Sequence, residues 1–149
     1  MAYQPAFLAQ RHEHAKVLAA RDAGRPTPGT LILVEHEPVI TVSNRASAAS
    51  NLLATPAMLA RAGVAVERTD RGGDITYHGP GQLVAYPICD LNLLNLGLRE
   101  YMRLLESAVI DACDGFGIAA HRDAQAAGVW VTPPGAKLCA MGVRVQRWV

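Results

Sequence analysis

Apolar residues recur at helical spacing in three stretches of the chain. This spacing predicts helices over Gln4–Ala23, Ala57–Ala62 and Gly97–Phe116. Thr55 is typical of the residue that begins a helix, and Gly63 is typical of the residue that ends one. The short second helix therefore has a marked start and a marked stop.

The two longer helices each combine an apolar face with a polar face. In the first helix Leu8 lies on the predicted apolar face, whereas Glu13 and Arg21 lie opposite. In the third helix the apolar face runs to Phe116, and Glu106 is predicted to pair with arginines on the outer face. Each of these helices is therefore predicted to bury one side only.

Runs of branched apolar residues predict strands between and after the helices. The predicted strands are Thr30–Val34, Val39–Val42, Val64–Arg68, Ile75–Tyr77, Leu83–Ile88, Ile118–His121, Gly128–Thr132 and Lys137–Val145. The turn Glu35–Pro38 is expected to fold Val39–Val42 back antiparallel onto the strand before it, with His36 facing solvent. The last two strands are expected to form a hairpin across Pro133-Pro134-Gly135.

Composition narrows the class of protein. A chain of 149 residues is about the length of one domain, and 50% hydrophobic with 18% charged residues argues against disorder. No apolar run reaches the roughly 20 residues of a membrane span, and a net charge of +1 gives no case for nucleic acid. The three cysteines are widely spaced without a C-x-x-C pair, which predicts thiols in a reducing compartment, the cytoplasm.

The stretch Arg71–Ile88 concentrates the unusual residues of the chain. Its glycines alternate with polar side chains that include Asp74 and His78. Glycine lets the backbone turn sharply and approach a ligand closely, and the apolar run Leu83–Ile88 that follows is typical of a buried strand. A polar loop that leads into a buried strand indicates a binding site, over which the polar loop Ser43–Leu53 is expected to close.

Residue types alone leave a second interpretation open. Two ordinary tight turns around the strand Ile75–Tyr77 would have the same glycines, proline and polar residues. The stretch has neither G-x-x-x-x-G-K-[ST] nor G-x-G-x-x-G, so no phosphate-binding motif supports a nucleotide site.

The order of residues in this stretch is more specific than their types. It reads Arg71-Gly-Gly-x-x-Thr-Tyr-His-Gly-Pro-Gly-Gln, followed by Tyr86-Pro87. The flanking motifs are Leu31-Ile-Leu-Val-Glu-His-Glu-Pro-Val-Ile-Thr-Val, Gly128-Val-Trp-Val and Lys137-Leu-Cys-Ala-Met-Gly-Val-Arg-Val. Together they resemble the lipoyl(octanoyl) transferases, which move an octanoyl group from acyl carrier protein to a lysine of lipoyl domains. The resemblance runs from about Ala6 to the last residue.

The resemblance implies a fold and a domain. The fold is α+β, a mixed, largely antiparallel sheet flanked by helices, as in biotin and lipoate ligases. Residues 1–149 would form a single octanoyltransferase-like catalytic domain that is truncated at its C-terminus. A strand that precedes the first helix in the family would be missing at its N-terminus.

The resemblance also implies covalent chemistry. The family forms an acyl-thioester on a cysteine, and the lysine that matches Lys137 lowers the pKa of that cysteine, which in the family lies beyond Val149. Cys139 is close to Lys137, but its position varies in the family, and it is expected to pack as a small hydrophobe. Lys16 and Lys137 are the two lysines of a chain with twelve arginines, so an amine at position 137 is expected to be required.

Two substrate-binding segments follow from the same resemblance. The first, which lines an acyl tunnel and its mouth, consists of Arg71, Gly72, Gly73, Asp74, Ile75, Thr76, Tyr77 and His78. The second, which faces the thioester carbonyl, consists of Ala140, Met141 and Gly142. The implied partners are octanoyl-acyl carrier protein and the lipoyl domains of 2-oxoacid dehydrogenases and the glycine cleavage H protein. No cofactor, metal, nucleic acid or membrane is expected to take part.

Two alternative functions remain open at this point. One is an ATP-dependent lipoate or biotin ligase, although the Gly-rich stretch differs from the loop of those ligases. The other is a catalytically inactive acyl-binding module. ATP binding would favour the first alternative, and acyl binding without transfer would favour the second.

Overall fold

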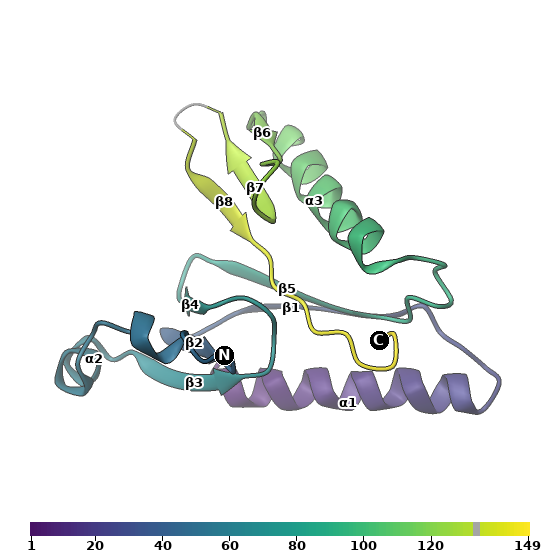
Figure 1. Ribbon diagram of the computed structural model, residues 1–149, viewed down its shortest axis with the longest axis horizontal. Coiled ribbons are helices and arrows are strands. Elements are labelled where there is room, and N and C mark those ends of the chain that lie inside the picture. The colour runs from purple at the N-terminus through teal and green to yellow at the C-terminus, as the bar shows by residue number, and fades with distance from the viewer. Residues whose placement is uncertain (133–134) are drawn as a thin grey trace. The chain divides into compact units, whose positions relative to one another are not determined.

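The computed structural model describes residues 1–132 and 135–149 (Figure 1). These residues form two compact units. The first unit contains Met1–Leu94 and Val143–Val149, and the second contains Asn95–Gly142. The elements of the first unit are α1 (Tyr3–Asp22), β1 (Gly29–Glu35), β2 (Val39–Ser43), the 3-10 helix η1 (Ala49–Asn51), α2 (Pro56–Ala62), β3 (Ala65–Thr69), β4 (Ile75–His78) and β5 (Leu83–Cys89). Those of the second are α3 (Leu98–Asp114), β6 (Ala120–His121), β7 (Gly128–Val131) and β8 (Lys137–Ala140).

Helix α1 packs against β1 and β5 through residues that repeat every three or four positions. Tyr3, Ala6 and Val17 are buried on this side, and Val17 joins the core cluster of the first unit. The predicted face holds at Leu18, which packs against the core cluster, but it is wrong at Leu8, which is exposed. It is also wrong at Glu13, which lies on the packed side and accepts a hydrogen bond of 2.8 Å from the Thr30 hydroxyl. A polar residue is tolerated there because it has a partner.

The first unit contains two small sheets. Strand β1 pairs antiparallel with β5, from Gly29 opposite Cys89 to Glu35 opposite Leu83. Strand β2 lies at the centre of the other sheet, parallel to β3 and antiparallel to β4. The Thr41 side chain of β2 is buried in this sheet, close to the predicted substrate segment that β4 carries.

The prediction that β2 folds back onto β1 is wrong, and so is the prediction that His36 faces solvent. His36 is only 1% exposed, with Nδ1 3.1 Å from the Met1 carbonyl oxygen and Nε2 2.9 Å from the Tyr86 hydroxyl. These two contacts hold the connection inside the unit, so β1 and β2 enter different sheets.

In the second unit, α3 packs against β6 and β7 of a three-stranded antiparallel sheet. Glu106 is buried, although the sequence placed it on the outer face; it accepts bonds from Arg103, Arg122 and the Gly128 N–H. Phe116 is 84% exposed because the helix ends at Asp114, before the predicted apolar face is complete.

The hairpin of β7 and β8 is confirmed, while two residues of its turn, 133 and 134, lie outside the described residues. Its second strand ends at Ala140, so the predicted strand Lys137–Val145 is too long. The physical reason is that Val143 leaves the hairpin: its carbonyl accepts a hydrogen bond of 3.0 Å from the Gly72 N–H in the first unit.

The predicted fold class is confirmed. Helices and small sheets are combined, and among the described strand pairs β2 with β3 is parallel while the others are antiparallel. Within the described part of the chain, no helix has both the length and the apolar character that crossing a bilayer requires.

Candidate active site

Arg71 organises the first predicted substrate segment. Its Nη2 donates hydrogen bonds of 2.8 Å to the hydroxyls of Thr41 in β2 and Thr76 in β4. Burial lowers the pKa of Arg71, but a guanidinium stays charged at neutral pH. No carboxylate of the described residues lies within ion-pair distance of it. The segment therefore contains a half-buried positive charge that is held by neutral hydroxyls.

The backbone between Arg71 and β4 turns at Gly73. Its φ of +102° is unfavourable for residues with a side chain. The Ser43 hydroxyl donates to the Gly73 carbonyl at 2.9 Å, and the Ser43 N–H donates to the Asp74 carbonyl at 3.4 Å. Buried Ser43 at the end of β2 thus fixes the path of the segment.

Asp74 connects the segment to η1. Its Oδ2 accepts a short hydrogen bond from the Asn51 side-chain amide, so the polar loop after β2 does contact the segment. Its Oδ1 is buried, and within the described residues it accepts no hydrogen bond. A buried carboxylate oxygen without a donor is costly and could accept one from a ligand.

His78 ends β4 beside the buried His36. Their ring centroids are 5.7 Å apart, and His78 Nδ1 lies 2.6 Å from the Gln82 side-chain oxygen. Burial lowers the pKa of His78, which favours a neutral imidazole at pH 7. Tyr77 alternates with His78 along the strand, and its side chain is exposed.

Behind His78, the protonation of His36 follows from its partners. The Met1 carbonyl can only accept, so His36 Nδ1 carries a proton, and in the neutral ring Nε2 accepts from the Tyr86 hydroxyl. Burial raises the pKa of Tyr86 to about 12, so this hydroxyl stays protonated. The hydrogen-bonded pair of His36 and Tyr86 thus lies beside His78 and supports the end of the segment.

The second unit holds the remaining predicted residues. Lys137 is exposed; its Nζ donates to the Ala127 carbonyl at 3.3 Å and lies 4.5 Å from the centre of the Trp130 ring. Ala140 ends β8 opposite Gly128, Met141 is half-buried and Gly142 is exposed. Within this unit the ammonium is held by a carbonyl and an aromatic ring.

Cys139 and Lys137 do not share a face of β8. A bulge places Lys137 opposite Trp130 and Cys139 opposite Val129, which are consecutive and therefore face opposite sides of the sheet. Burial raises the pKa of the Cys139 thiol, the reverse of what an attacking thiol needs.

Sequence reasoning missed the residues that support the first segment. Thr41 and Ser43 were counted as part of a strand and a loop, and His36 as a surface residue. The available signal was their place in or beside an apolar strand: a polar side chain that is buried there needs a partner. Which partner it would find depends on pairing between β2 and β4, which local patterns do not encode.

The chain is similar to known proteins along nearly its whole length. Residues 8–149 match the family model described as the lipoyl protein ligase A/B catalytic domain. An octanoyltransferase of Chloroflexus aurantiacus is 45% identical over 146 residues, which are 98% of this chain and 63% of that protein. Those of Porphyromonas gingivalis and Bacteroides thetaiotaomicron are 40% and 41% identical over 99% of this chain, and the aligned parts are 30% and 66% of those proteins.

The chain therefore spans less than two thirds of the length of these relatives. The similarity itself covers nearly the whole chain and includes every residue of both predicted substrate segments and Lys137. The chain belongs to the lipoyl protein ligase A/B catalytic domain family.

Proposed function

We propose that the chain is part of a single octanoyltransferase catalytic domain that moves an octanoyl group from acyl carrier protein to a lysine of lipoyl domains. The observation that carries this proposal is the identity of 40–45% to proteins named octanoyltransferase over nearly the whole chain. The activity would be the first step in attaching lipoyl groups made from endogenous octanoate.

The reaction needs a nucleophile and a proton carrier. A cysteine thiolate beyond Val149 attacks the carbonyl carbon of the donor thioester, and the carrier thiol leaves. The acceptor amine then attacks the new thioester, loses a proton and releases the cysteine. Lys137 lowers the pKa of that cysteine, a role that its exposed ammonium, held by the Ala127 carbonyl and the Trp130 ring, supports.

The substrate would contact both predicted segments. Arg71 to His78 line the acyl site and its mouth, where the charge of Arg71 can polarise a carbonyl oxygen. The buried Oδ1 of Asp74, which has no donor among the described residues, can accept an N–H there. Ala140, Met141 and Gly142 offer small side chains and backbone groups to the thioester. None of these steps calls for a cofactor or a metal.

The proposed partners are octanoyl-acyl carrier protein and the lipoyl domains of 2-oxoacid dehydrogenases and the glycine cleavage H protein. A reaction through a cysteine thiolate requires a reduced thiol, which supports the cytoplasm as the compartment.

The test is transfer in a protein that includes the nucleophilic cysteine. It is mixed with octanoyl-acyl carrier protein and a lipoyl domain without ATP, and the intact mass of the lipoyl domain is followed. A gain of one octanoyl group supports the proposal. Modification only with ATP and free octanoate would identify a ligase, and binding of octanoyl-acyl carrier protein without modification would identify an acyl-binding module.

A further inference from the structure

The segment Val143–Val149 returns to the first unit and meets the start of the first substrate segment. The Gly72 N–H donates to the Val143 carbonyl at 3.0 Å, and the Arg144 guanidinium forms an ion pair with Asp70. Two neighbouring residues of the returning segment thus bind residues on either side of Arg71. We name these two contacts the 70–144 staple.

We infer that Asp70 and Arg144 are positioning residues for the reaction, because the staple fixes the backbone on either side of Arg71, where the first substrate segment begins. Arg71 lies between Asp70 and Gly72, and Val143 directly follows Gly142 in the chain. The inference rests on the proposed function only in its claim that the two residues serve octanoyl transfer. The staple itself is a property of the first unit.

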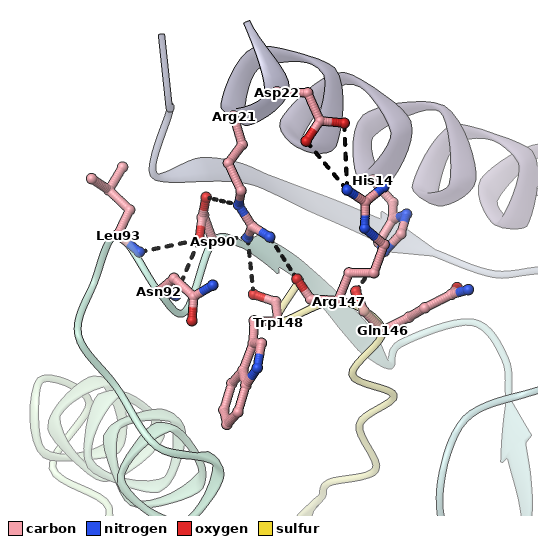
Figure 2. Close-up of polar contacts among 9 residues, drawn as sticks. All are labelled: His14, Arg21, Asp22, Asp90, Asn92, Leu93, Gln146, Arg147 and Trp148. Carbon is pink, nitrogen blue, oxygen red and sulfur yellow. Dashed lines mark hydrogen bonds and ion pairs between the residues drawn. The ribbon is translucent and has the colours of Figure 1, made fainter. Parts of the chain in front are cut away.

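The returning segment is anchored a second time, independently of the staple (Figure 2). Arg21 donates to the carbonyl oxygens of Arg147 at 2.6 Å and Trp148 at 3.5 Å, and it is paired with Asp90 at 2.6 Å. Val149 is buried in the core cluster. Loss of the staple should therefore leave the segment attached.

The staple fixes the position of the segment more than it adds to the free energy of unfolding. The side chains of Asp70 and Arg144 are 29% and 41% exposed, and ion pairs at such exposure contribute little to folding. A second cation, Arg11, lies 3.7 Å from the Asp70 carboxylate and keeps that charge compensated when Arg144 is changed. An effect of Arg144 on the reaction would then reflect the position of the segment.

The first arm of the test uses the 149-residue chain and needs no activity. Hydrogen exchange of the Gly72 amide is measured in the parent, in Arg144→Gln and in Asp22→Asn, which removes the exposed ion pair between Arg147 and Asp22. We expect Gly72 exchange to rise at least tenfold in Arg144→Gln and to stay at the parent rate in Asp22→Asn.

The second arm measures octanoyl transfer in a protein that includes the nucleophilic cysteine. Arg144→Gln should lower kcat about tenfold with a small change in KM and a parent-like Tm, because misplaced groups slow the chemical step. Arg144→Lys keeps the charge and should recover part of the loss.

The outcomes separate the two proposals. Parent-like Gly72 exchange in Arg144→Gln, or an equal rise in Asp22→Asn, overturns the staple. Raised exchange with unchanged kcat overturns the positioning role. A parent protein that transfers nothing while Gly72 responds as expected counts against the proposed function and leaves the staple supported.

Discussion

The two lysines of the chain have different surroundings. Lys16 is paired with Glu13 on α1, whereas Lys137 lies over Trp130 without a carboxylate partner among the described residues. An arginine at 137 would keep the contact with the ring, because a guanidinium also stacks on aromatic faces. It could not lose its proton at neutral pH.

Lys137→Arg should therefore keep the fold and lose most of the transfer activity, by at least about 100-fold, the lower end of the usual contribution of a proton-transfer group. The measurement is transfer kinetics beside far-UV circular dichroism, in a protein that includes the nucleophilic cysteine. The matched control is Lys16→Arg, which should behave like the parent. Parent-like rates with Arg at 137 would make Lys137 an ordinary edge charge.

Gly73 is the residue of the first segment whose backbone excludes a side chain. At its φ of +102° an added Cβ would also lie 3.0 Å from Arg71 Nη1. Gly73→Ala should lower the free energy of unfolding by about 1 kcal/mol or more. Urea unfolding measures this loss.

The control is Gly115→Ala, where φ is −59° and an added Cβ meets only ordinary contacts, so this variant should lose no stability. Equal midpoints for both variants would show that the turn is not strained.

At the scale of elements, Asp90 is the point where α1, the end of β5 and the returning segment are linked. Its carboxylate binds Arg21 and accepts the N–H groups of Asn92 and Leu93 at 3.0 and 3.1 Å (Figure 2). Removing this buried carboxylate leaves each of these donors without an acceptor, which costs free energy.

Asp90→Ala should therefore destabilise the first unit by about 3 kcal/mol. The expected measurement is a lower urea midpoint, followed through the fluorescence of Trp148 in a Trp130→Phe background. Asp22→Asn serves as the control, since its exposed pair should be worth less than about 0.5 kcal/mol. An unchanged midpoint for Asp90→Ala would refute the linking role.

The sequence predicted where helices and strands lie better than it predicted which strands pair. The helices α2 and α3 and the strands β4 and β5 lie within one or two residues of their predicted bounds, because caps, glycines and apolar spacing are local signals. The pairing of β1 with β5, across the whole of β2, β3 and β4, is not local, and a turn such as Glu35–Pro38 cannot reveal it. The same holds for the site. A long motif predicted its two segments, whereas its supporting residues Thr41, Ser43 and His36 were not predicted.

At the scale of the whole molecule, each unit contains a buried carboxylate with a lowered pKa. For Asp90 the main cause is the hydrogen bond from Arg21. For Glu106 burial opposes ionisation, but the Gly128 N–H and the guanidiniums of Arg103 and Arg122 outweigh it. A pKa that is lower in the folded than in the unfolded state stabilises the fold above the unfolded pKa, and this contribution disappears as the pH falls through the folded value.

The stability of both units should therefore be nearly constant above about pH 5 and fall below about pH 4. The test is the urea midpoint at a series of pH values, with Trp148 reporting on the first unit and Trp130 on the second. Asp90→Asn should flatten the acid loss of the first unit only, and Glu106→Gln that of the second only. Acid sensitivity that is identical in parent and variants would show that other groups cause it.

The first unit is discontinuous in sequence, because Asn95–Gly142 are inserted between its two parts. During synthesis the residues of the second unit emerge from the ribosome before Val143–Val149 emerge. The second unit can therefore fold first, while the core around Val17 and Ile88 stays incomplete until Val149 packs into it. For that interval Met1–Leu94 presents unfinished apolar surface, which is the stage at which a growing chain depends most on chaperones.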